Sequence, residues 1–150
     1  MATGQVSSIT GDTWQLIATN TPTSGTTTTF SSITGYKELW IIWTGIVGAA
    51  NTLNMTFNST STGYSSFVVG WDRSTTAIYL AVDSSSSVHG FVKIKDVNST
   101  TGPKMTEGME YQNAARTTGV WNNTSAITTI TITKNSAFTA GTFTLYGIAA

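Results

Sequence analysis

The sequence predicts an all-β fold: an antiparallel two-sheet β-sandwich of jelly-roll-like form, with about nine to eleven short strands. Apolar and polar residues alternate along most of the chain, which is the pattern of strands that bury one face. Clusters of Gly, Pro, Asn, Asp and Ser interrupt the alternation at intervals typical of turns. Threonine is abundant within the alternating stretches, and its branched Cβ fits a pleated strand.

Each expected strand carries apolar residues two positions apart, and these should share one face of the strand. The turn residues that separate the strands lie near 21–25, 34–35, 59–63, 83–87, 98–103 and 122–123. In chain order, the apolar sets are Trp14, Leu16 and Ala18; Leu53, Met55 and Phe57; Phe67, Val69 and Trp71; Ile78, Leu80 and Val82; Val88, Val92 and Ile94; Ile130 and Ile132; and Phe143 and Leu145.

The segment 105–116 has two interpretations. It could form a short helical turn, or it could form a strand that carries Met105, Glu107, Met109 and Tyr111 on one side. No other part of the chain has a convincing helical pattern. The all-β prediction therefore does not depend on this segment.

The stretch from Leu39 to Trp43 breaks the alternation because both of its faces are apolar. This pattern indicates either a central strand that is covered on both sides or a strand that keeps one face for a partner. In a two-sheet sandwich the outer face is wet, so Trp40 and Ile42 would need a loop of the same chain, a further layer or a second subunit to cover them.

The first ten residues lack a consistent apolar face. We expect residues 1–10 to be an N-terminal arm that a partner orders or that simply frays, and residues 11–150 to form a single β-sandwich domain. Val6 and Ile9 are apolar residues that such an arm would bury. Together with Trp40 and Ile42, they are the candidate interface residues.

The composition argues against several classes of function. Charged residues make up only 9% of the chain, and seven basic residues balance seven acidic ones. Nucleic acid and anionic membranes are not expected partners, because no electropositive surface is available to bind phosphates. A net charge near zero instead favours association with other chains.

The sequence suggests neither secretion nor membrane insertion. The N-terminus lacks the basic segment and apolar core of a signal peptide, and the apolar run from Leu39 to Ala50 is too short to span a membrane. The chain also contains no cysteine, so it can form no disulfide. We expect synthesis in a cytoplasm, or function in a particle assembled there.

Catalytic residues are not expected either. His89 is the sole histidine, so it cannot build a multi-histidine metal site, although Ser87 on the same side of the strand could hydrogen-bond to it. Glu107 and Glu110 are three positions apart and would face opposite ways on a strand. Asp83 and Asp96 lack the dense spacing of a calcium loop. We therefore assign no catalytic, cofactor-binding or metal-binding residue.

Two further patterns have plain structural interpretations. The Asn-x-Ser/Thr sequons arise by chance in a chain so rich in Ser and Thr; they begin at Asn54, Asn58, Asn98, Asn122 and Asn123. A second set of residues could form a sugar-stacking platform, but core packing is the favoured role for large aromatics in a sandwich. This set comprises Trp14, Trp43, Trp71, Trp121, Tyr36, Tyr64 and Tyr79.

Several local patterns follow one another in a recognisable order. A Trp-containing opening strand and a Thr/Ser hairpin lead to Phe30-Ser31-Ser32-Ile33 and Tyr36-Lys37-Glu38-Leu39. After an apolar strand come Leu53 to Asn58 and Gly63-Tyr64, and the chain closes with Val120-Trp121, Ser125 to Ile130, and GTFTLYGIAA from Gly141 to Ala150. In this order, over nearly the whole chain, the patterns resemble those of small virion proteins of tailed phages, especially phages of cyanobacteria and other aquatic bacteria.

The resemblance implies a non-enzymatic virion component, above all a capsid decoration or cement protein on the outer surface of the head. It implies the major capsid protein as partner and self-association, with a trimer favoured, after synthesis in the host cytoplasm. The alternative is a receptor-binding or glycan-binding module of a tail or head fibre. A hydrolase that depends on Glu107 or Glu110 is a third and weaker hypothesis.

Overall fold

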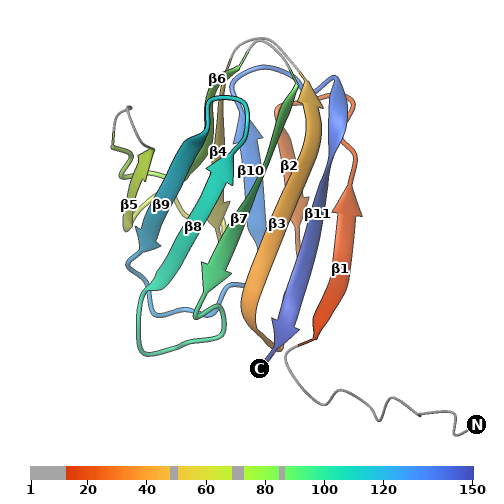
Figure 1. Ribbon diagram of the computed structural model, residues 1–150. Coiled ribbons are helices and arrows are strands. Elements are labelled where there is room, and N and C mark those ends of the chain that lie inside the picture. The colour runs from red at the N-terminus through yellow and green to blue at the C-terminus, as the bar shows by residue number, and fades with distance from the viewer. Residues whose placement is uncertain (1–12, 48–50, 69–72, 85–86) are drawn as a thin grey trace, which may run out of the picture.

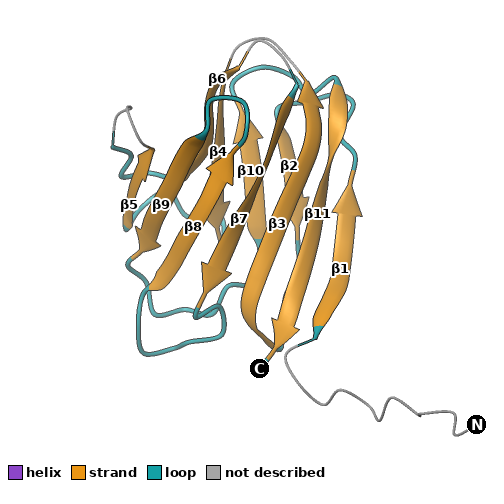
Figure 2. Cartoon of the chain, in the orientation of Figure 1, coloured by secondary structure: helices purple, strands orange, loops and turns teal. Residues whose placement is uncertain are grey.

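The computed structural model describes residues 13–47, 51–68, 73–84 and 87–150. Within these ranges the chain forms eleven strands in two antiparallel sheets and no helix, as Figure 1 and Figure 2 show. The larger sheet contains β1 (Trp14–Asn20), β3 (Tyr36–Val47), β5 (Tyr64–Val68), β7 (Val88–Lys95), β8 (Lys104–Glu110), β9 (Ala115–Trp121) and β11 (Ala140–Ala149). The smaller sheet contains β2 (Thr27–Phe30), β4 (Asn51–Phe57), β6 (Ile78–Ser84) and β10 (Ile130–Lys134).

The strand order confirms the predicted jelly-roll-like sandwich. The seven-stranded sheet has the order β1-β11-β3-β7-β8-β9-β5, and the four-stranded sheet has the order β2-β10-β4-β6. The quartet β1-β11-β3-β7 and the four-stranded sheet together have the double-sheet arrangement of a jelly roll, since the chain passes back and forth between the sheets from β1 to β4. The remaining strands β8, β9 and β5, called here the added strands, extend the larger sheet beyond β7 (Figure 1).

The core lies between the two sheets and follows the predicted alternation. In β3, Leu39, Ile41 and Trp43 are fully buried, and their neighbours Trp40 and Ile42 point to the outer face. The stretch from Leu39 to Trp43 is thus a central strand whose inner face fills the core. Burying each such side chain contributes about 1.5–3 kcal/mol.

The prediction that Trp14, Leu16 and Ala18 share one face of the first strand is wrong. Trp14 is 48% exposed and Leu16 is 63% exposed, whereas Ala18 packs against the core. The register of β1 against β11 shifts between Leu16 and Ala18. A bulge of this kind adds one residue to one strand, so the apolar set divides between the two faces.

The third predicted set also differs from the structure. Phe67 is 49% exposed on the outer face of β5, while Tyr64, Ser66 and Val68 face inward. Val69 and Trp71, the other members of this set, lie outside the described residues.

The segment 105–116 forms strands rather than a helical turn. It covers most of β8, a turn at 111–114 and the first residues of β9. Met105 and Glu107 are exposed, which agrees with the strand interpretation that placed them on one side with Met109 and Tyr111. That side is the outer face of the larger sheet.

Side-chain hydrogen bonds join the two sheets to each other at both edges of the sandwich. On one side, Ser66 Oγ accepts from the Tyr79 amide at 3.0 Å, and Thr117 Oγ1 donates to the Tyr79 carbonyl. On the other side, Asn20 Nδ2 donates to the Thr29 carbonyl at 3.0 Å. These contacts satisfy backbone groups on β6 and β2, which are the edge strands of the smaller sheet.

Asn58, one of the sequon asparagines, has a structural role. Its φ of 50° places it in the left-handed region, which asparagine tolerates better than most residues. Its Oδ1 accepts from the amides of Thr128 (2.9 Å) and Thr129 (3.1 Å), and its Nδ2 donates to the Ala126 carbonyl (2.8 Å). Asn58 thereby fastens the end of β4 to the segment that precedes β10.

Candidate binding face

The outer faces of the two sheets have opposite character. The four-stranded sheet presents mainly hydroxyl and amide groups at its outward positions; these residues are Thr27, Thr29, Thr52, Asn54, Thr56, Thr131 and Thr133. All the exposed large hydrophobic side chains of the described residues lie instead on the outer side of the seven-stranded sheet; they are Trp14, Leu16, Phe67, Met105 and Tyr111. Exposed apolar side chains that gather in patches on one face mark interaction sites.

The strand register gathers residues from the whole chain into one row on this face. Residues that lie directly opposite each other on neighbouring strands share a face, so each pair extends the row by one strand. From β1 to β5 the row reads Leu16, Tyr146, Trp40, Lys93, Glu107, Thr118 and Phe67. Its first part is apolar and aromatic, and its middle is charged.

Four aromatic rings pack together at the β1 end of the face. The centroid of the Trp14 ring lies 4.8 Å from that of Trp40 and 5.5 Å from that of Tyr146. The Trp40 ring also stacks on Phe91, with the centroids 5.6 Å apart. We call these four residues and Ile42 the aromatic patch.

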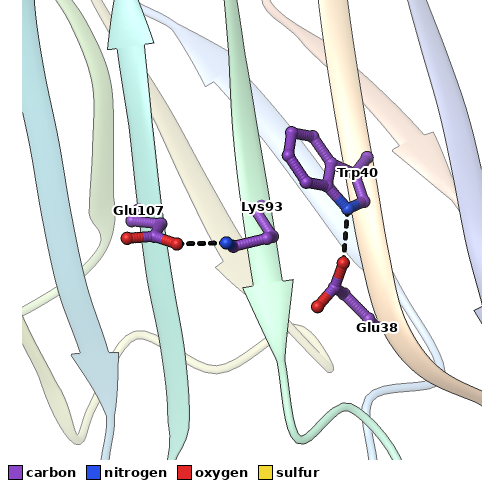
Figure 3. A network of polar contacts seen from close by, with 4 residues as sticks. All are labelled: Glu38, Trp40, Lys93 and Glu107. Atoms are coloured by element: carbon purple, nitrogen blue, oxygen red, sulfur yellow. Dashed lines mark hydrogen bonds and ion pairs between the residues drawn. The ribbon is translucent and has the colours of Figure 1, made fainter.

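Polar contacts hold the Trp40 ring in place, as Figure 3 shows. Its Nε1 donates to Glu38 Oε1 at 2.6 Å, and Lys93 Nζ lies 5.4 Å from the ring centroid. Lys93 in turn forms an ion pair with Glu107 on β8. A ring that is already held in one orientation loses less entropy when a partner binds to it.

The ion pair keeps both of its members charged. The hydrogen bond from Lys93 holds the pKa of Glu107 below its usual value, and the same bond raises the pKa of Lys93. Both groups are near the surface, so the pair contributes under about 1 kcal/mol to stability. Its main effect is on position, because it anchors the lysine that lies beside the Trp40 ring.

A hollow of about 460 Å³ adjoins the aromatic patch and is bordered by Thr44, His89 and Tyr111. His89 Nδ1 accepts a hydrogen bond from the Gly45 amide at 3.3 Å. Nε2 lies 3.1 Å from Ser87 Oγ, so the structure shows the hydrogen bond that the sequence allows between these residues. The contact of Nδ1 joins β7 to the end of β3, and the contact of Nε2 holds the ring against the residue that precedes β7.

Of the four candidate interface residues, two lie on this face. Trp40 and Ile42 are adjacent on the outer face of β3 and are half-buried by neighbouring side chains; no loop of the described residues is needed to cover them. Val6 and Ile9, with the whole expected arm, lie outside the described residues.

The expectation that Trp14 packs in the core is wrong, whereas Trp43 and Trp121 are fully buried as expected. The sequence reasoning also missed Phe91 and Tyr146 as members of the patch. A signal for Phe91 was present, because it lies out of phase with the apolar set Val88, Val92 and Ile94.

The carboxylates of β8 do not form a pair. Glu107 is exposed, whereas Glu110 is 1% exposed and accepts from the amides of Gln112 and Asn113. They face opposite sides of the sheet, as the spacing predicts. Among the described residues, no group of three or more His, Cys, Asp or Glu side chains is arranged to hold a metal ion. The same part of the chain contains no helix able to cross a membrane.

No protein-family model matches the chain, and no curated protein matches it by sequence.

Proposed function

We propose that this domain is a non-enzymatic structural protein of a phage virion, a capsid decoration or cement protein that binds the outer surface of the head and stabilises the shell. Its partner would be the major capsid protein, and a trimer is the favoured form of self-association. Support comes from two sources: the resemblance of its ordered sequence patterns to virion proteins, and the distribution of apolar surface over its two sheets.

The observation that carries the proposal is the concentration of exposed apolar side chains on one face. Trp14 and Leu16 stand on β1 of the seven-stranded sheet and Tyr111 lies in the turn after β8, while the opposite sheet presents threonines. With a net charge of zero, little electrostatic repulsion opposes the approach of other chains. Such a domain is suited to binding another protein through the seven-stranded sheet while the four-stranded sheet stays exposed to solvent.

Adhesion through the aromatic patch is the expected mechanism. Large aromatic side chains at the centre of an interface supply most of its binding free energy, and polar groups around them exclude water. Trp14 and Trp40 would be the central anchors. Jelly rolls occur both in viral capsids and in lectins, so the fold alone does not choose between adhesion to a shell and recognition of a glycan.

Replacing Trp14 by alanine is expected to weaken binding of the purified domain to capsids that lack it by about 30-fold, which corresponds to ~2 kcal/mol. The melting temperature should change little, because the Trp14 side chain is 48% exposed. Co-sedimentation with capsids over a range of domain concentrations measures the affinity.

Tyr79→Ala is the matched control, since it removes an aromatic side chain from the smaller sheet. Its binding should stay within about threefold of the unsubstituted domain. Equal losses for Tyr79→Ala and Trp14→Ala would contradict adhesion through the aromatic patch. If the domain does not bind capsids but binds neutral glycans through Trp14, the result would instead support a receptor- or glycan-binding module of a fibre.

A further inference from the structure

The added strands carry a second hollow, on the opposite side of the Lys93–Glu107 ion pair from Trp40. It has a volume of about 500 Å³, which is within the range of pockets that bind small molecules. Met105 and Val120 lie opposite each other in the strand register and form an apolar floor. Phe67, which is 49% exposed, stands beside them. We call this site the added-strand hollow.

A cationic side chain stands at each end of this floor. Arg73 donates through Nη2 to Ser65 Oγ at 2.9 Å, and Ser65 lies opposite Val120. Lys95 lies opposite Met105 on the other side. Three strand spacings separate the backbones of Ser65 and Lys95, or about 14 Å, and both long side chains border the hollow.

Within the described residues, neither Arg73 nor Lys95 forms an ion pair. The hydrogen bond to Ser65 fixes one edge of the Arg73 guanidinium, and its other N–H groups still form the fork that suits a carboxylate. An arginine positioned in this way is already oriented for an anionic ligand.

Oxygen atoms border the long side of the floor. Thr118 and Glu107 are opposite each other in the register and both line the hollow. Lys93 pairs with Oε1 of Glu107, and the carboxylate, which has two acceptor oxygens, can also accept hydrogen bonds from hydroxyl groups of a ligand. The hollow therefore combines apolar contact, anion recognition and hydroxyl recognition in one site.

We propose that the added-strand hollow binds an acidic sugar, that is, a glycan unit that carries a carboxylate. The C–H face of the sugar ring packs on Phe67 and Met105, its carboxylate binds Arg73 or Lys95, and its hydroxyls bind Glu107 and Thr118. An acidic peptide fits less well, because it would bring carboxylates close to Glu107 without supplying hydroxyl donors. The site lies outside the aromatic patch, so this proposal does not depend on adhesion to a capsid.

Titration calorimetry of the whole chain with tetragalacturonate tests the proposal, with maltotetraose as the neutral probe. Tetragalacturonate should bind at least about tenfold more tightly than maltotetraose. The double variant Arg73→Ala/Lys95→Ala and the single variant Phe67→Ala should each weaken that binding by at least about tenfold. Lys37→Ala is the control, because it removes a positive charge from β3, which does not border the hollow, and it should leave binding unchanged. Melting curves check that each variant is folded.

Four results would overturn the assignment. The first is an absence of tetragalacturonate binding at about 10 mM probe, since even a weak glycan site saturates near that concentration. The second is equal binding of the neutral and acidic probes, and the third is unchanged binding by the folded Arg73→Ala/Lys95→Ala variant. The fourth is equally tight binding of a polyglutamate peptide, which would indicate general attraction of anions rather than recognition of a sugar.

Discussion

Replacing Lys104 by methionine is expected to lower the free energy of unfolding by about 2–3 kcal/mol. Lys104 is fully buried, and its ammonium group donates to the carbonyls of Ser99 (2.6 Å), Gly102 (3.2 Å) and Asn123 (3.0 Å). All three ammonium hydrogens are therefore used. Burial lowers the pKa of Lys104, and the carboxylate of Asp96 opposes this shift.

Methionine keeps the length of the side chain but donates no hydrogen bond, so the three carbonyls would lose their donor. They belong to the loop before β8 and to the segment after β9, which Lys104 holds together. Urea denaturation measures the loss. Lys95→Met, at an exposed site, is the control and should change stability by under about 0.5 kcal/mol. A loss below about 1 kcal/mol for Lys104→Met would contradict this structural role.

Replacing Gly90 by alanine is expected to destabilise the domain by about 2–3 kcal/mol. A Cβ at this position would lie 2.4 Å from the Met109 carbonyl oxygen and 2.4 Å from Cζ2 of Trp43. Trp43 is fully buried, and the backbone of β8 is fixed by its pairing with β7. Neither neighbour can move away without disturbing the sheet beneath the aromatic patch.

Gly102→Ala is the matched control, because the nearest atom to its added Cβ is Ser99 Oγ at 3.9 Å. This substitution should change stability by under about 0.5 kcal/mol. Thermal unfolding of the two variants under identical conditions gives the comparison. Equal melting temperatures would mean that the contact between Gly90 and Trp43 is looser than its geometry indicates.

The sequence was sufficient to predict the fold because alternation directly reflects burial in a sandwich. The residues of β3 are the clearest case: their double-faced apolar pattern predicted both a core strand and an unusual outer face. The jelly-roll order follows from pairing between distant segments such as β1 and β11. Local periodicity does not reveal that pairing, because it specifies neither the partner of a strand nor its register.

The candidate face was predicted only in part, and the reasons are physical. A bulge between Leu16 and Ala18 turned Trp14 outward, and a one-residue irregularity leaves no mark in a pattern of alternation. Tyr146 joins Trp14 and Trp40 because β11 lies between β1 and β3, a neighbourhood that depends on the tertiary fold. Lys104 was missed because its burial depends on carbonyls supplied by two separate loops.

Imaging of purified virions tests the central claim most directly, because it gives both the location and the copy number of this chain. The proposal predicts many copies on the outer surface of the head, with the aromatic patch of each copy against the shell or a neighbouring copy. Finding the chain only on the tail, or finding particles that contain none of it, would contradict the proposal.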